Sequence, residues 1–183
     1  MTEVLGSGLQ VGVDVGGTKL LAAVIDGDGQ VLASHQRPTP APQRPAPELT
    51  DAVVEAVRWV AKGVRVEAVG IAAAGLVDAA GERVVFAPHL AWRDADVRAD
   101  LADRLGVRVA LDNDANCAAL AESIHGAARW ASSAVVLTLG TGIGGAFVVD
   151  GRVWRGASGM AGEFGHMVVQ PGEVVTLLGR NGA

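Results

Sequence analysis

Residues 11–25 read Val11-Gly-Val-Asp-Val-Gly-Gly-Thr-Lys19, followed by Leu20-Leu-Ala-Ala-Val-Ile25. An apolar, β-branched run with a single acid, Asp14, meets a Gly-Gly-Thr-Lys turn, and a second apolar run follows it. This pattern predicts a strand, a tight turn and an antiparallel return strand. Glycines let a backbone come close to a bulky anion, and turn N–H groups, a hydroxyl and an ammonium suit phosphate oxygens. The stretch therefore indicates either a phosphate loop or a Gly-rich hairpin with a solvated lysine.

The composition limits the class of protein. The chain has 183 residues, a net charge of -5 and 50% hydrophobic residues, enough for one generous domain with a sizeable core. An acidic balance argues against a broad nucleic-acid surface. The single Cys117 excludes an internal disulfide framework and a multi-cysteine metal site. The N-terminal residues do not follow the pattern of a secretory signal, and no apolar run reaches membrane-spanning length. We expect a cytoplasmic protein without nucleic-acid or membrane partners.

The following residues predict alternating strands and helices. Apolar runs at 31–36, 66–74 and 107–111 are typical of strands, and apolar spacing at 48–62 and 94–105 is typical of amphipathic helices. Five prolines between residues 38 and 47 exclude both a helix and a central strand there, so we interpret this segment as a surface connector.

The order of elements in residues 11–37 returns at residues 134–154. An apolar strand, a Gly/Thr turn, an apolar strand, an Asp-Gly turn and a third strand follow one another in both. The second Gly/Thr turn is Gly140-Thr-Gly-Ile-Gly-Gly145. Two phosphate-type hairpins, each leading a separate lobe, suggest a nucleotide held in a cleft between lobes.

Three acids are candidates for chemistry. Asp14, beside the first Gly turn, suits positioning of Mg²⁺ or phosphate, or it caps its own turn. Asp114 follows a strand and is flanked by amides; it suits a base that accepts a proton from a hydroxyl, or it is a helix N-cap. Glu163 and His166 lie in a Gly-rich loop and suit hydrogen bonds to a polyol, or they are a solvated loop pair. Transfer of a phosphoryl group to a hydroxyl fits this set best, because it needs phosphate cradles, Mg²⁺ and a positioned base.

Six motifs occur in a fixed order. They are Asp14-Val-Gly-Gly-Thr-Lys19, Ala72-Ala-Ala-Gly-Leu-Val-Asp78, Phe86-Ala-Pro-His-Leu-Ala-Trp92, Asn113-Asp-Ala-Asn116, Leu139-Gly-Thr-Gly-Ile-Gly-Gly145 and Gly156-Ala-Ser-Gly-Met-Ala-Gly-Glu-Phe-Gly-His166. Together they resemble the ROK (repressor, open reading frame, kinase) family of sugar kinases, and within it the actinobacterial-type glucokinases. The resemblance covers about residues 10–170.

The resemblance implies an α/β architecture, the actin-like, ribonuclease H-like ATPase fold. It implies phosphorylation of a hexose by ATP with Mg²⁺, typically of glucose to glucose 6-phosphate, and usually a homo-oligomer. A kinase for fructose, mannose or an N-acetylated hexosamine, an inactive fragment of a kinase, and a transcriptional regulator are the alternatives. The regulators place a helix-turn-helix before the first phosphate motif, where only ten residues stand here, so this last alternative is disfavoured.

The resemblance also implies roles for single residues. Asp114 corresponds to the general base, and Gly75, Asn113, Asp114, Glu163 and His166 to the sugar site. The first phosphate site is implied at Asp14, Gly16, Gly17, Thr18 and Lys19, with Mg²⁺ near Asp14. The second is implied at Gly140, Thr141, Gly142 and Gly144.

The sequence departs from the family pattern in three ways. His89 stands where the glucokinases usually have Asn, which predicts altered sugar contacts. The family continues into a zinc motif, Cys-x-Cys-Gly-x-x-Gly-Cys; without such cysteines His166 has no thiolate partners, and structural zinc is not expected. The chain also stops before the rest of the second lobe and the adenosine-binding region, which predicts weak phosphorylation of glucose.

The last residues, Gly172-Glu-Val-Val-Thr-Leu-Leu-Gly-Arg-Asn-Gly-Ala183, resemble the strand and opening of a Walker A loop in an ABC-transporter ATPase. They lack the Gly-Lys-Ser/Thr that would complete it. A divergent ROK terminus is the alternative interpretation. We therefore expect an N-terminal actin-like lobe at 1–115, a partial C-terminal lobe at 116–171 and a non-family tail at 172–183.

Overall fold

The computed structural model describes residues 8–139 and 142–166. A five-stranded sheet forms the first part of the molecule, with strand order β3-β2-β1-β4-β8. Its strands are β1 (Leu9–Val15), β2 (Lys19–Ile25), β3 (Val31–Pro38), β4 (Val66–Ala73) and β8 (Arg108–Asn113). β1, β2 and β3 form the expected antiparallel meander, and β1, β4 and β8 run parallel. The carboxyl ends of these three parallel strands therefore meet at one edge of the sheet.

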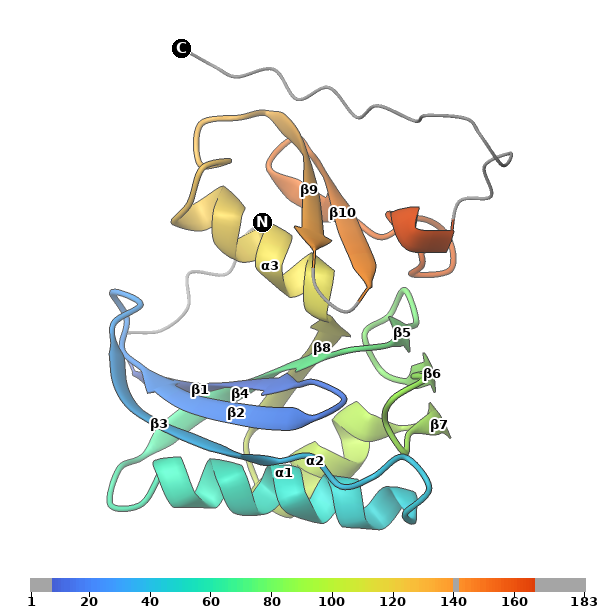
Figure 1. Ribbon diagram of the computed structural model, residues 1–183. Coiled ribbons are helices and arrows are strands. Elements are labelled where there is room, and N and C mark those ends of the chain that lie inside the picture. The colour runs from blue at the N-terminus through green and yellow to red at the C-terminus, as the bar shows by residue number, and fades with distance from the viewer. Residues whose placement is uncertain (1–7, 140–141, 167–183) are drawn as a thin grey trace.

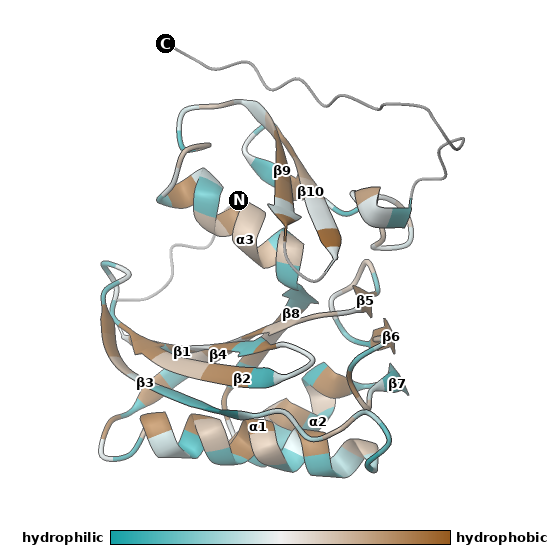
Figure 2. Ribbon diagram, in the orientation of Figure 1, coloured by the Kyte–Doolittle hydropathy of each residue, from teal (hydrophilic) through white to brown (hydrophobic). Residues whose placement is uncertain are grey.

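Alternation along the strands sends one set of side chains into the core. In β1, Val11, Val13 and Val15 are buried, whereas Asp14 points to the other face and is exposed. Two helices, α1 (Ala46–Val60) and α2 (Val97–Leu105), cover the buried face (Figure 1). In Figure 2 the central strands β1, β2 and β4 are mostly hydrophobic, whereas β3 and the two helices mix hydrophobic and hydrophilic residues. Such a mixture is expected for helices with one buried face.

The helix ends follow local chemistry. α1 begins directly after Pro45 and carries Pro47 in its first turn, where the missing N–H costs no hydrogen bond. α2 ends at Gly106, whose φ of 69° is the left-handed conformation that glycine adopts without strain. Residues 39–45 form the expected connector. Pro38 ends β3 and Pro47 lies in the first turn of α1, so the expectation that the whole Pro-rich segment excludes strand and helix is wrong at its two ends.

A small three-stranded sheet lies between β4 and α2 in the chain. It consists of β5 (Leu76–Val77), β6 (Val84–Phe86) and β7 (Arg93–Ala95). Trp92, one residue before β7, is 1% exposed, and its indole Nε1 donates a hydrogen bond to Thr50 Oγ1 at 3.2 Å. This contact fixes the small sheet to α1.

The second part of the molecule is smaller. It contains α3 (Asp114–Ile124), β9 (Ser133–Leu139), β10 (Ile143–Val149), β11 (Arg152–Trp154) and the short 3₁₀-helix η1 (Phe164–His166). α3 packs on one face of the β11-β10-β9 sheet through Ala119, Ala146 and Val148. In Figure 1 this part lies on the side of the large sheet opposite α1 and α2.

Several elements differ from the sequence-based predictions. The strand expected at 107–111 continues to Asn113, so Asp112 and Asn113, expected in a polar loop, belong to β8. Residues 93–95, expected within or beside a helix, form β7. Gly144 and Gly145, expected in a turn, lie inside β10, where their lack of a side chain lets other groups pack closely. The residue ranges of the predicted domains are not tested by these elements and stay predictions.

Among the residues that the structure describes, no helix has the length and hydrophobicity needed to cross a membrane.

Candidate active site

The parallel strands bring sequence-distant polar residues to one edge of the large sheet. Asp14 of β1 pairs in register with Ala72 of β4, and Ala72 pairs with Asp112 of β8. These three positions share the face opposite the α1–α2 core. Asn113 and Asp114 come one and two residues later, at the end of β8 and the start of α3. Open α/β sheets bind ligands at the carboxyl ends of their strands, so this edge is the candidate site.

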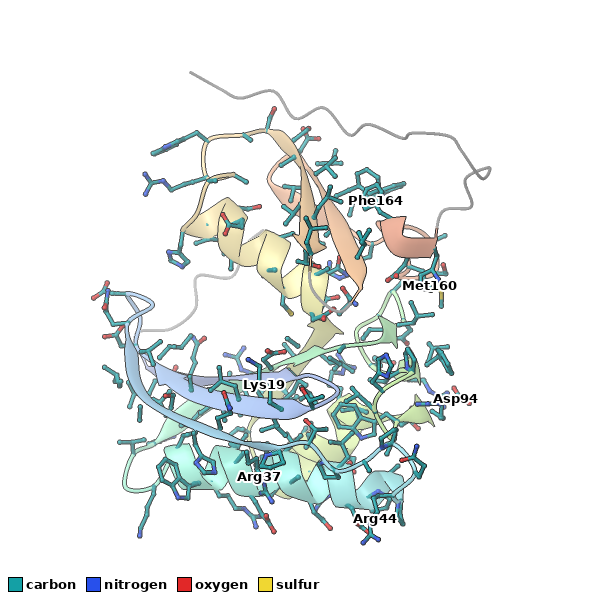
Figure 3. The ribbon with its side chains drawn as sticks, in the orientation of Figure 1. Lys19, Arg37, Arg44, Asp94, Met160 and Phe164 are labelled. Atoms are coloured by element: carbon teal, nitrogen blue, oxygen red, sulfur yellow. The ribbon has the colours of Figure 1, made fainter. Side chains whose placement is uncertain are left out.

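The first Gly turn is closed by backbone bonds and by a residue from the Pro-rich connector. Gly16 N donates to Lys19 O at 3.0 Å, and Thr39 Oγ1 donates to Gly16 O at 2.7 Å. Thr39 N also donates to Thr18 O at 3.1 Å. Thr39 thus pairs two turn carbonyls, and Thr18 and Lys19 keep exposed side chains (Figure 3 labels Lys19).

His89 lies against this turn. A Cβ built on Gly17 would come within 2.6 Å of His89 Cβ, so only glycine fits at position 17 while His89 keeps its place. His89 is exposed. The residue that departs from the family pattern therefore stands beside the first candidate phosphate loop.

The junction between β8 and α3 is built by Asn113, not by Asp114. Asn113 Oδ1 accepts hydrogen bonds from Ala115 N at 2.9 Å and Asn116 N at 3.1 Å, which makes Asn113 the N-cap of α3. Asn113 Nδ2 donates to Gly75 O at 3.1 Å. The N-cap alternative for Asp114 is therefore wrong.

Asp114 is left with one short-range bond, from Ala115 N to Oδ1 at 2.9 Å, and an exposed side chain. Its carboxylate keeps acceptor capacity for a ligand. Asn113, by contrast, has both acceptor positions of Oδ1 occupied and one free N–H, so a sugar could receive only a single hydrogen bond from its side chain.

Three carboxyl groups around this edge have raised pKa values. Partial desolvation raises the pKa of Asp14, although its side chain is exposed, and the Lys19 charge opposes this shift. Desolvation raises the pKa of Asp114, the bond from Ala115 N opposes the shift, and the negative charge of Asp14 adds to it. Desolvation also raises the pKa of Glu163, with Asp114 contributing in the same direction and His166 opposing. The three predicted acids are thus close enough to interact electrostatically.

Glu163 reaches this edge through a loop that packs tightly on the second sheet. Gly162 has a φ of 94°, and a Cβ there would approach Gly145 O to 2.5 Å. The Phe164 ring packs on Phe147 of β10 with 5.1 Å between centroids. Figure 3 shows Phe164 and Met160 at this side of the second part. His166 Nε2 lies 3.8 Å from Glu163 Oε2, and its side chain is 80% exposed.

The second candidate phosphate loop is only partly described. Gly140 and Thr141 lie outside the described residues. Gly142 has open space where a Cβ would stand. Gly144 faces α3: a Cβ there would meet Thr138 Oγ1 at 2.6 Å and Ala115 Cβ at 3.4 Å, so this glycine permits the close approach of helix and strand.

The residues do not fit the structural zinc of the family. The chain has one cysteine, Cys117, and it lies on α3. Burial and the nearby acids raise the pKa of the Cys117 thiol to about 12, so it is not a thiolate ligand. Within the described ranges, no three His, Cys, Asp or Glu side chains gather as a metal site. Mg²⁺ needs fewer protein ligands, because it keeps waters and binds substrate phosphates, and Asp14 suits it.

Sequence reasoning missed three residues that shape this edge. Thr39 comes from the Pro-rich connector, and its only signal is a hydroxyl in a segment assigned to a loop. Asp112 and Arg155 form an ion pair between the two parts of the molecule. No local pattern marks such a pair, because its members are 43 residues apart.

The five-stranded sheet, the second hairpin sheet across from it and the acids at the strand ends define an actin-like ATPase fold. The chain belongs to the ROK family, whose sequence profile matches residues 10–182. It is 39% identical over 176 residues to the glucokinase of Streptomyces coelicolor, covering 96% of this chain and 54% of that protein.

Solved structures of ROK family kinases also match this chain. A ROK family glucokinase from Streptomyces griseus, in complex with glucose and AMPPNP, matches with a TM-score of 0.83 and 41% identity, over 90% of this chain and 52% of that one. A ROK hexokinase from Thermus thermophilus matches with a TM-score of 0.77 and 38% identity, over 92% and 56%. The chain thus spans about half the length of the relatives it matches.

The family match also runs through most of the segment 172–183. The non-family tail at 172–183 stays a prediction.

Proposed function

We propose that the protein transfers a phosphoryl group from ATP to a hydroxyl of a hexose, glucose in the first instance, with Asp114 as general base. The observation that carries this proposal is the junction of β8 and α3, where Asn113 caps the helix and leaves the Asp114 carboxylate with a single hydrogen bond. The charges of Asp14 and Asp114 also help to raise the pKa values of Asp114 and Glu163, respectively. Each acid comes from a different motif, and together they surround the edge where open α/β sheets bind ligands. The glucokinase relatives support the choice of substrate.

Asp114 suits the base because it is not committed elsewhere. Asn113 caps the helix in its place, so a hexose hydroxyl can approach the free positions of the Asp114 carboxylate. Desolvation raises the pKa of this carboxyl, which makes the ionised form a better proton acceptor. As the hydroxyl oxygen attacks the γ-phosphorus, Asp114 takes the hydroxyl proton, and ADP leaves with the bridging oxygen.

The first Gly turn would hold the phosphates. Gly16 would shape this turn, because its N–H donates to Lys19 O. Gly17, Thr18 and Lys19 would supply N–H groups, a hydroxyl and an ammonium, and Asp14 would position the Mg²⁺ that accompanies ATP. When bound there, Mg²⁺ would supply positive charge against the phosphate oxygens. Glu163 and His166 would bind sugar hydroxyls from the opposite side, and the carbonyl of Gly75 orients Asn113.

The test is ADP formation by the purified chain with ATP, Mg²⁺ and glucose. We expect weak glucose-dependent turnover that falls by a further factor of about 10²–10⁴ in Asp114→Asn, because a general base contributes about this factor. Glucose affinity, measured by calorimetry, should stay within a few fold. Asp103→Asn, at an exposed position of α2, is the matched control.

Unchanged turnover in Asp114→Asn would remove Asp114 from the base role. Glucose binding without turnover in the unsubstituted chain would favour a sugar-binding remnant, and the absence of both would contradict the proposal. Fructose, mannose and N-acetylated hexosamines, compared by kcat/KM, distinguish the hexose alternatives.

A further inference from the structure

One ion pair joins the two segments that contain the candidate base and the candidate sugar-binding acid. Arg155, directly after β11, donates from Nε to Asp112 Oδ2 at 2.9 Å and from Nη2 to the same oxygen. Asp112 is the next-to-last residue of β8, two residues before Asp114. The Asp112 side chain is 15% exposed and that of Arg155 is 37% exposed, so the pair is largely withdrawn from water.

Asp112 has no spare acceptor for a ligand. Its second oxygen, Oδ1, accepts from Asn116 Nδ2 at 2.8 Å and from Asn113 N at 2.9 Å. Four donors therefore occupy the roughly four acceptor positions of the carboxylate. Two of these donors lie in the turn that contains Asp114, so Asp112 connects that turn to Arg155.

Arg155 is equally fixed on its own side. Its carbonyl oxygen accepts a hydrogen bond from Ala161 N at 3.1 Å, which closes the loop 156–160 immediately before Glu163. Gly159, at the tip of this loop, has a φ of 89° and lies against the backbone of residues 77–79. The position of Arg155 thus determines where the backbone of Glu163 lies.

We propose that Asp112 and Arg155 are a positioning pair that sets the distance between Asp114 and Glu163, and hence the affinity for the hexose. This inference rests on the proposed function. Neither residue touches the substrate: Asp112 acts through the β8–α3 turn and Arg155 through the 156–160 loop. The pair links the two acids through the chain, because Asp114 comes two residues after Asp112 and Glu163 follows the loop that begins at Arg155.

The positioning pair makes a specific kinetic prediction. Arg155→Met leaves the Asp112 carboxylate without its charged partner and removes the side-chain link between β8 and the residue from which the 156–160 loop begins, so the acids separate. Small displacements of positioned groups cost up to about 100-fold in rate. We expect the KM for hexose to rise about 10–100-fold. The KM for ATP should stay within about twofold, because the first candidate phosphate loop lies between β1 and β2, away from the positioning pair.

The experiment is a double-mutant cycle of Arg155→Met, Asp112→Asn and the double variant, read by KM for glucose and KM for ATP. The double variant should lose little more than either single variant, since both remove the same contact. Arg155→Lys keeps the charge without the two-nitrogen contact and should be intermediate. Arg152→Met, an exposed arginine of β11, is the matched control and should change neither constant.

A second measurement does not need turnover. Hydrogen exchange at the Ala161 amide should accelerate in Arg155→Met and not in Arg152→Met. Faster exchange with an unchanged KM for glucose would overturn the positioning role, and so would equal rises in both KM values. If the unsubstituted chain neither binds nor phosphorylates glucose, the proposed function has failed. In that case hydrogen exchange at the Ala161 amide still tests whether the Arg155 side chain anchors the 156–160 loop. An unchanged exchange rate in Arg155→Met would overturn this anchoring role.

Discussion

The two parts of the molecule are built from similar hairpins but bury very different cores. The five-stranded sheet and its two helices enclose large side chains, among them Trp92, Leu20, Leu49 and Ile71. In the described residues of the second part, the buried hydrophobic cluster consists of Ala119, Ala146 and Val148. Because stability from burial scales with the apolar area removed from water, the first part contributes most of the folding free energy.

The second sheet also leaves much of one face exposed within the described residues, although Phe164 packs on Phe147 there. Its exposed hydrophobic side chains alternate with the inward-facing ones. They are Val135 (56%), Leu139 (78%), Ile143 (52%), Val149 (45%) and Trp154 (56%). A repeated strand-turn-strand pattern therefore sets local structure, whereas stability depends on what covers each face of the sheet. Four predictions test this difference between the two parts of the molecule.

The largest effect is expected in the first core. Trp92→Ala removes a fully buried indole and its bond to Thr50, and should lower the free energy of unfolding by about 3–5 kcal/mol. Urea denaturation followed by circular dichroism measures it. Trp130→Ala, at 85% exposure, should stay within about 0.5 kcal/mol. Equal losses from both would mean that the first core does not dominate stability.

A smaller loss is expected in the second core. Val148→Ala removes the equivalent of two buried methylenes, about 1.6 kcal/mol at about 0.8 kcal/mol each. Hydrogen exchange should accelerate in α3, β9 and β10 and remain unchanged in β1 and β4, because the two cores are separate clusters. Val135→Ala, on the exposed face, is the control. Faster exchange throughout both sheets would show that they unfold as one unit.

The third prediction concerns the junction between β8 and α3, which joins the two parts of the molecule. Asn113→Ala removes the N-cap of α3 and the bond to Gly75, and should cost about 0.5–2 kcal/mol in thermal unfolding. Asn113→Asp keeps an acceptor for the cap and removes only the Nδ2 donor, so it should recover part of the loss. If Asn113→Asp were as destabilising as Asn113→Ala, the Gly75 bond rather than the cap would stabilise the junction.

The smallest effect concerns the acids of the site. The pKa of Asp114 is raised in the folded protein, so at neutral pH its ionised form opposes folding. Asp114→Asn should therefore raise the melting temperature slightly at pH 7, with a gain in stability below about 0.5 kcal/mol for this exposed group. The gain should shrink as the pH falls through the raised pKa, because the native carboxyl then becomes protonated.

Asp103→Asn, at an exposed position of α2, is the control. A gain that grows toward acid pH would mean that Asp114 is stabilised in its ionised form, contrary to the raised pKa. Such a result would also weaken the case for Asp114 as a base.

Much of the fold was predictable because periodicity is a local signal. The alternation of Val11, Val13 and Val15 around Asp14 gave β1, and the spacing of Leu49, Val53 and Val57 gave α1. The end of β8 was not predictable, because Asp112 and Asn113 have the composition of a loop. They continue the strand because β4 pairs with them through Ala72 and Ala73.

The candidate site also contains residues that the sequence predicted and residues that it did not. Asp14, Asp114 and Glu163 were identified from their own motifs, and the structure brings them within electrostatic reach of one another. The cap at Asn113 was misassigned to its neighbour, because sequence gives a capping residue only to within one position when two candidates are adjacent. Thr39 and Arg155 were missed because their partners are far away in the chain.

By itself, the sequence determined the two Gly-rich hairpins, the helices between them and the identity of the acids, since these follow from short-range periodicity and turn chemistry. Only the tertiary structure decided which acid is free to accept a proton and which residues hold it in place. The reason is physical: hydrogen-bond capacity is used up by whichever partners the fold brings near. Asn113 caps the helix, Asp112 pairs with Arg155, and Asp114 alone among the three keeps most of its acceptor capacity for a ligand.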